Sequence, residues 1–145
     1  MSRLPTPGGD EGNWGSVLND YLAVEHKEDG SHKIAYGLQT ENVKTVTASG
    51  ASQTIPAPTL FTITDITLTE ACNITLPAAT SGQSFTLILR QNAVGSKTVT
   101  WTGNVKWPLG TPPILTVSPL GVDALIFLST DGSNWLGFVA GYDIK

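Results

Sequence analysis

From Thr54 onward, apolar residues alternate with threonine and other polar residues in short runs separated by turn residues. Runs at intervals of roughly 8–12 residues are typical of β-sandwiches and barrels, because successive side chains of a strand point to opposite faces. Residues 124–128 are apolar at every position, which indicates a central strand or one buried between protomers. The predicted strands are Leu60–Leu68, Cys72–Leu76, Ser84–Gln91, Lys97–Thr102, Ile114–Val117, Val122–Ser129 and Trp135–Ala140.

Near the N-terminus, apolar residues recur every three or four positions instead of every two. One stripe is formed by Trp14, Val17, Leu18, Tyr21 and Leu22. This spacing predicts an amphipathic helix at about residues 14–26. Because so short a helix is marginal in water, the stripe needs a covering surface on another part of the structure or on another chain.

Charge divides the chain unevenly, with 11 of the 20 charged residues in positions 1–58. We therefore predict three regions: an N-terminal segment with the helix at 1–30, a linker or short stalk at 31–53, and a β head domain at 54–145. The linker is predicted because residues 31–53 have scattered apolar positions without a sustained period.

Composition supports a mainly β protein and excludes several kinds of partner. The chain has 19 threonines, whose β-branched hydroxyl side chains suit exposed strand faces. A net charge of −4 argues against binding to nucleic acid or anionic lipid. The single Cys72 excludes an internal disulfide, so we expect stability to come from oligomerisation. Neither a signal peptide nor a membrane span is expected.

Two ordered sets of residues carry a resemblance to known proteins. The first is Leu4-Pro5, Trp14-Gly15, Leu18-Asn19, Tyr21-Leu22, His26 and Asp29-Gly30. The second is Ile74-Thr75-Leu76-Pro77, Gly82, Leu87, Gln91, Gly95, Thr98-Val99-Thr100-Trp101, Val105-Lys106-Trp107-Pro108, Thr111-Pro112, Asp123, Phe127, Asp131-Gly132 and Trp135. Together they resemble bacteriophage tail-fibre and receptor-binding (minor tail) proteins, with a short N-terminal attachment segment and a small C-terminal β head domain.

This resemblance implies a homotrimeric virion protein that is made in the host cytoplasm and has no catalytic residues. The expected fold is mainly β: an antiparallel β-sandwich or jelly-roll-like head with one short N-terminal helix. The chain departs from typical fibres because it has no Gly-x-y shaft repeat between the two segments.

We therefore predict a non-enzymatic tail fibre or tail appendage that attaches to the virion and to the host surface. The virion-attachment residues would be the helical stripe, Trp14, Val17, Leu18, Tyr21 and Leu22. The expected partners are copies of the same chain, other proteins of the tail or capsid, and host-surface glycan, with no cofactor. The alternative is a capsid decoration or cement protein without a receptor role. A glycan-active enzyme is a third and less favoured hypothesis.

Side chains that could support other chemistry are few. His26 and His32 match no common zinc spacing, although three copies around an axis could pool their ligands. Cys72 is expected to be a small buried apolar residue rather than a reactive thiol. A glycosidase would need two carboxylates across a cleft, and the available carboxylates are Asp65, Glu70, Asp123, Asp131 and Asp143.

The tryptophans are the remaining candidates for ligand binding, because aromatic rings stack on the apolar faces of sugars. Trp107, Asn134 and Trp135 are the predicted receptor contacts. In the alternative interpretation, Trp101 and Trp135 are core residues and Trp107 packs on Pro108.

Overall fold

The computed structural model describes residues 12–22 and 41–145, which fall in two units, Met1–Thr40 and Glu41–Lys145. In the first unit, helix α1 spans Trp14–Leu22, and the amide of Val17 donates to the carbonyl of Asn13. This confirms a helix at the predicted place, and residues 23–26 of the prediction lie outside the described residues. Among the described helices, none has the length and apolar character needed to cross a membrane.

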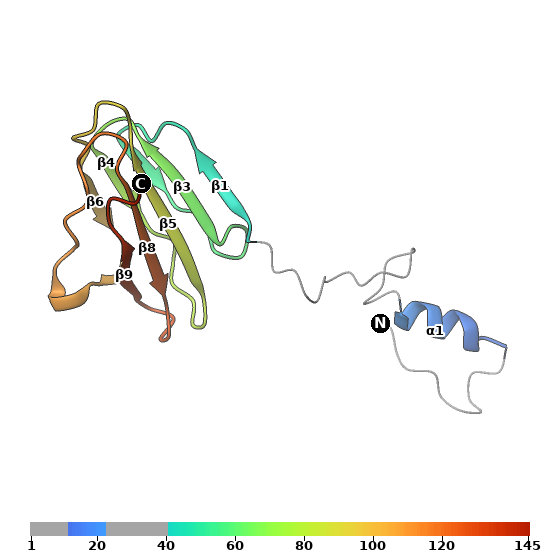
Figure 1. The fold of residues 1–145 in the computed structure, drawn as a ribbon. Coiled ribbons are helices and arrows are strands. Elements are labelled where there is room, and N and C mark those ends of the chain that lie inside the picture. The colour runs from blue at the N-terminus through green and yellow to red at the C-terminus, as the bar shows by residue number, and fades with distance from the viewer. Residues whose placement is uncertain (1–11, 23–40) are drawn as a thin grey trace. The chain divides into compact units, whose positions relative to one another are not determined.

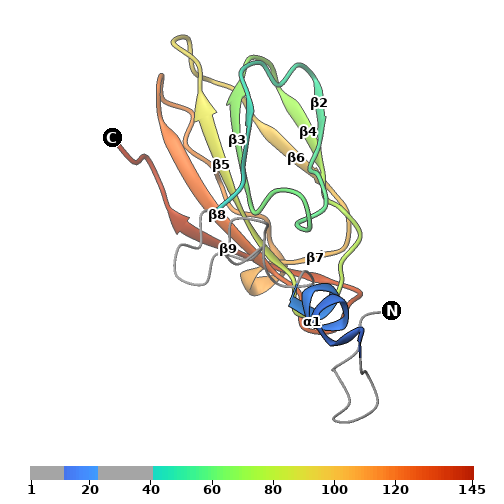
Figure 2. The ribbon, with the colours of Figure 1, turned by 90° about the vertical axis from the view of Figure 1, so that its right-hand side faces the viewer.

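The second unit consists of two β-sheets stacked face to face (Figures 1 and 2). The larger sheet has six strands in the order β1-β3-β5-β8-β9-β7, and the smaller sheet has three in the order β2-β4-β6. The strands are β1 (Val43–Val46), β2 (Ser52–Thr54), β3 (Ile63–Leu68), β4 (Cys72–Thr75), β5 (Ser84–Gln91), β6 (Val99–Thr102), β7 (Val105–Lys106), β8 (Val122–Leu128) and β9 (Trp135–Gly141). A short 3-10 helix, η1, spans Pro108–Gly110.

From β1 to β6 the chain alternates between the two sheets, so it winds as a coil. Strands β1, β3 and β5 pair in parallel in one sheet, and β2, β4 and β6 pair in parallel in the other. Parallel neighbours require a crossover connection, and here the strand in the opposite sheet is that crossover. The coil is closed by β8, which pairs antiparallel with β5, and by β9, which pairs antiparallel with β8.

Equivalent positions of successive turns stack inside the coil. Val46, Ile66 and Leu89 are register partners that point inward. On the other side, the amide of Ile55 donates to the carbonyl of Thr75 in the next turn. The sequence repeats at this point, since Thr54-Ile55-Pro56-Ala57 is followed 21 residues later by Thr75-Leu76-Pro77-Ala78.

Aromatic rings fill the space between the coil and the closing strands. Phe85 of β5 stacks on Phe127 of β8 at 4.8 Å between ring centroids and meets Trp135 of β9 edge-on at 5.0 Å. The enclosed Trp135 indole N–H donates to the carbonyl of Pro77 at 2.8 Å, which satisfies its only polar group. Fully covering rings of this size supplies much of the apolar burial of a small domain.

The mainly β class with one short helix is confirmed, while the strand pairing needs correction. The expected antiparallel arrangement is found only for β5–β8 and β8–β9, and the other pairs are parallel. Alternation in a sequence reports which residues face the core but not the direction of the neighbouring strand. Six of the seven predicted strands match within a few residues, and Ser84–Gln91 matches at both ends.

Two other boundaries also differ from the prediction. Strands β1 and β2 lie within the range 31–53 that was predicted to be a linker, so the β unit begins by Glu41. These strands have four and three residues and pair with residues about 20 positions later. Strands this short contain too few residues to show a clear alternation of apolar and polar positions. The predicted strand Ile114–Val117 is not a strand, because Pro112, Pro113 and Pro119 flank it and it has no neighbour in either sheet.

Buried Gln91 at the end of β5 holds the turn into β6 and the segment before β8. Its side-chain N–H groups donate to the carbonyls of Lys97 and Thr116 at 2.7 and 2.9 Å, and its oxygen accepts from the amide of Lys97 at 3.0 Å. With 4% exposure, this amide satisfies backbone groups that water does not reach.

Replacing Gln91 with Leu should therefore destabilise the β unit by about 2–4 kcal/mol, because three backbone groups lose their partner. Urea unfolding followed by tryptophan fluorescence measures the change. Gln83→Leu, at a half-buried glutamine before β5, is the matched control and should cost about 1 kcal/mol or less. Equal effects of the two substitutions would contradict the anchoring role of Gln91.

Candidate functional site

An apolar groove lies beside β9, where Trp107 follows the short strand β7. Strand β7 pairs with the beginning of β9 through Val105 and Trp135, which brings Trp107 next to Gly137. A Cβ atom at Gly137 would lie 2.5 Å from the indole ring, so only glycine leaves room for it. The centroid of the Trp107 ring lies 5.1 Å from that of Trp101 and 5.7 Å from that of Phe127. These contacts hold the ring in place as the inner wall of the groove.

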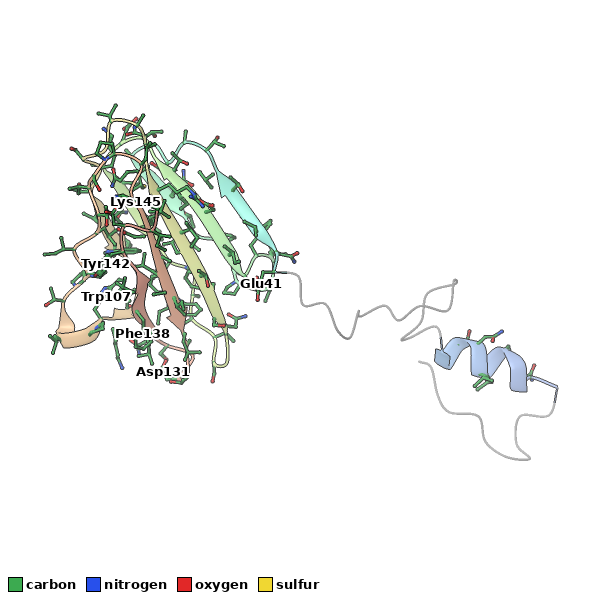
Figure 3. The ribbon with its side chains drawn as sticks, in the orientation of Figure 1. Glu41, Trp107, Asp131, Phe138, Tyr142 and Lys145 are labelled. Atoms are coloured by element: carbon green, nitrogen blue, oxygen red, sulfur yellow. The ribbon has the colours of Figure 1, made fainter. Side chains whose placement is uncertain are left out.

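The groove has a volume of about 540 Å³ and opens between β9 and the proline-rich segment after Trp107. Its lining is Trp107, Pro108, Leu109, Thr111, Pro112, Pro113, Ile114, Gly137, Phe138, Val139 and Tyr142. Trp107, Phe138 and Tyr142 lie along the same side of the β unit (Figure 3). None of the lining side chains is charged, so the groove suits a ligand with apolar faces.

Two buried polar side chains hold the far end of the proline-rich segment in place. The Gln91 amide donates to the carbonyl of Thr116, and the amide of Thr116 donates to Asp123 Oδ2 at 2.6 Å. The other carboxylate oxygen, Asp123 Oδ1, accepts from the amide of Asp143 at 3.0 Å, next to the groove residue Tyr142. Asp123 therefore ties both walls of the groove to β8, and its 2% exposure keeps water from competing.

A tight polar loop between β8 and β9 adjoins β7. Asp131 Oδ1 accepts from the amides of Ser133 and Asn134, and Oδ2 accepts from the Asn134 side chain at 2.9 Å. These hydrogen bonds, the Asn134 side chain first, together with nearby Lys106 lower the pKa of Asp131 to about 2. The loop therefore keeps its anionic anchor at neutral and mildly acidic pH.

The structure separates the three predicted receptor contacts. Trp107 is half-buried and lines the groove, and Asn134 is half-buried in the polar loop. Trp135, in contrast, is 1% exposed and belongs to the core, so its side chain cannot reach a receptor. The neighbouring sequence positions of Asn134 and Trp135 point to opposite faces because they begin a strand.

Phe138, Tyr142 and the prolines of the groove were not among the predicted contacts. Phe138 is 46% exposed and Tyr142 51% exposed, which is unusual for large aromatic residues in a small domain. The sequence signal for them is the run of apolar residues from 135 to 142 after the Asp-Gly turn. One face of a strand can bury only every second residue of such a run, so the others are expected on the surface.

The predicted attachment stripe falls in the first unit. Val17 and Leu18 are half-buried on α1, while Asn19 and Asp20 are exposed. Trp14, Tyr21 and Leu22 lie on the same helix, but their side chains are outside the described residues. The stripe is therefore placed on a helix of nine residues.

The side chains considered for other chemistry have structural surroundings where they are described. Cys72 is 2% exposed, and burial raises the pKa of its thiol, as expected for an apolar role. Asp65 forms an ion pair with Arg90 at 2.8 Å. Across residues 12–22 and 41–145, no three His, Cys, Asp or Glu side chains cluster as metal ligands would, and His26 and His32 lie outside this range.

Comparison with known proteins gives one match. Residues 54–118 match the family model described as "Putative phage tail fibre C-terminal domain". Over these residues the chain is similar to the C-terminal domain of phage tail fibres. No curated protein and no solved structure matches the chain. The resemblance to phage tail-fibre proteins is thus confirmed from β2 through the proline-rich wall of the groove, while the quoted positions from Asp123 to Trp135 lie beyond the match.

This match supports a structural protein of a phage tail, and hence a component of the virion. The matched range contains Trp107 and the segment up to Ile114, which make one wall of the groove. Strand β9, which makes the opposite wall, follows the matched range in the chain.

Replacing Gly137 with Ala should displace Trp107, because the added methyl group would overlap the indole ring. We expect a loss of stability of about 1–3 kcal/mol and a red-shifted tryptophan emission as the ring becomes hydrated. The control is Gly15→Ala in α1, where a Cβ atom meets nothing within 4 Å. An unchanged emission maximum and melting temperature in Gly137→Ala would show that Trp107 does not depend on this contact.

Proposed function

We propose that this chain is a non-enzymatic tail appendage that attaches to the virion through its N-terminal unit and meets the host surface with its β unit. The observation that carries the proposal is the tail-fibre match within the β unit, at residues 54–118. The division of the chain at residue 40 supports two separate tasks. The match also favours a tail position over capsid decoration.

We propose further that the protein works as a homotrimer. Its free cysteine is buried, so no disulfide within the chain stabilises it. Association is a common way for small chains to gain the buried apolar area that a single copy lacks. Light scattering of the full chain should give about three times 15.3 kDa.

Attachment to the virion is assigned to α1 on the basis of its amphipathic surface. Nine residues are too few for a stable isolated helix in water, so the helix needs a surface that covers its apolar side. Val17 and Leu18 supply apolar side chains beside the exposed polar pair Asn19 and Asp20. Another tail protein that accepts an amphipathic helix in a groove is the partner with the fitting chemistry.

The virion-attachment role is tested by Val17→Ser combined with Leu18→Ser. This double variant should leave the melting of the β unit unchanged and reduce incorporation into phage particles at least tenfold. The matched control, Asn19→Ala combined with Asp20→Ala, changes the exposed positions and should assemble normally. Normal incorporation of the Ser double variant would refute attachment through α1.

Contact with the host surface is assigned to the groove beside β9. Trp107 and Tyr142 present aromatic surface, and Lys106, Asp131 and Asn134 add polar groups next to β7. Aromatic rings that stack on sugar faces together with polar side chains that bind hydroxyl groups are the chemistry of glycan recognition. Host-surface glycan is therefore the proposed ligand class.

Replacing Tyr142 with Ala should weaken binding of the full chain to host cells or purified host-surface polysaccharide by about tenfold, as expected for the loss of one aromatic contact. Val94→Ala is the control, because Val94 is 72% exposed in the turn after β5, outside the lining of the groove. Binding that is equal for wild type and Tyr142→Ala, with Val94→Ala also unchanged, would move the receptor contact away from this groove.

A further inference from the structure

The outer face of the six-stranded sheet carries an apolar row that crosses five strands. Register pairs join Val43 of β1 to Ile63 of β3, Ile63 to Thr86 of β5, Thr86 to Ile126 of β8, and Ile126 to Phe138 of β9. Register partners in a sheet point to the same side, and this side is opposite to the core. Val43, Ile126 and Phe138 are 51%, 42% and 46% exposed.

The neighbouring rows on this face are also poor in charge. Leu128 pairs with Leu136 beside the row, and Ile88 pairs with Ala124 on its other side. The two charged residues of the outer face on these strands, Asp65 and Arg90, bind each other through the guanidinium N–H groups at 2.8 to 3.1 Å. At the borders of the face, Glu41 lines a hollow beside β3 and β5, and Lys106 of β7 is the register partner of Leu136. The interior of the face therefore carries one pair of charges that neutralise each other.

Nothing within residues 41–145 covers this face. The three-stranded sheet packs on the opposite, inner side of the large sheet, and the outer side of β3, β5 and β8 faces the viewer of Figure 1. The unit has no α-helix that could be laid over it. A broad apolar sheet face without a cover is unusual for a monomeric soluble domain and indicates an interaction surface.

The face carries both a hollow and a projecting aromatic ring. A hollow of about 200 Å³ lies on the row, with Ile63, Thr86 and Ile126 among its lining residues. Phe138 projects from the same row two strands away from Thr86. Because the ring and the hollow lie at different places on the face, the ring of one copy can enter the hollow of the next, a heterologous contact of the kind that closes three subunits into a ring.

We propose that this outer face, centred on Ile126, is the surface through which copies of the chain associate. The inference rests on the proposed homotrimer and names its contact surface. Five strands about 4.8 Å apart and about six residues long project onto an area on the order of 500 Å². Because side-chain relief adds to this projection, the face approaches the roughly 800 Å² per partner of a stable interface.

Charge also favours a second copy over other occupants. Since Asp65 and Arg90 neutralise each other, neighbouring copies can pack on this face without leaving either charge unpaired. A glycan would find few free hydrogen-bonding side chains on the row itself, where Thr86 is the polar residue.

The test is the mass of the full chain in solution after Ile126→Lys, measured by light scattering at micromolar concentration. Wild type should give about three times 15.3 kDa and the variant the mass of one chain, because a buried unpaired lysine opposes association. Val94→Lys is the matched control: Val94 is 72% exposed in the turn after β5, outside both sheets and outside the groove, so this variant should keep the wild-type mass.

The outcomes separate this inference from the homotrimer proposal. A trimeric Ile126→Lys would refute the contact face and leave the trimer intact. A dimeric wild type with a monomeric variant would support the face and refute the trimer. A monomeric wild type would refute both. If Ile126→Lys fails to give the circular dichroism of the wild type, Phe138→Lys takes its place with the same expected mass.

Hydroxyl-radical footprinting of the wild-type chain provides an arm that needs no substitution. On association, oxidation of Phe138 should fall at least threefold relative to the same chain diluted to its monomer. Leu120, which is 68% exposed in the turn before β8 and outside the groove, should react equally in both states. Equal oxidation of Phe138 in the two states would overturn the proposal.

Discussion

The packing of Phe127 against rings from three other segments holds the β unit together. Phe85 comes from the parallel coil, Trp101 from the small sheet, and Trp107 from the segment beyond it. Strand β8, which carries Phe127, is therefore the element that joins the coil to the antiparallel closing strands. The last turn of the coil has no further turn packed against it. The aromatic rings cover this end and bury its apolar side chains, as another turn would.

The sequence predicted the local pattern of this fold better than its pairing. Alternating residues located the strand at 84–91 to the residue, because one face is buried and the other is hydroxylated. The parallel coil was missed, since strands 20 residues apart pair in it and alternation carries no information about direction. The repeat of Thr-Ile-Pro-Ala at 54–57 as Thr-Leu-Pro-Ala at 75–78 was the available signal, because equal spacing of equal motifs indicates stacked turns.

The candidate site was predicted in part. Trp107 lies in the groove as expected of a binding residue, but Trp135 is buried because its indole N–H reaches the carbonyl of Pro77, 58 positions earlier. No local pattern distinguishes these two tryptophans, since the difference arises from long-range contacts. The opposite wall, with Phe138 and Tyr142, depends on Asp123 binding the backbone at residues 116 and 143, which only the folded chain brings together.

Phe138 belongs to both proposed surfaces, because it lines the groove and projects from the outer face of the large sheet. If copies associate through that face, each groove lies at its border, where a neighbouring copy changes the exposure of the same ring. Association would then help to shape the ligand site and would place three grooves on one trimer. Since linked weak sites bind a repetitive surface far more tightly than one site, modest affinity per groove is enough for attachment to a polymeric glycan. A low-charge, threonine-rich surface fits this task, because it presents few charges that would bind unrelated partners.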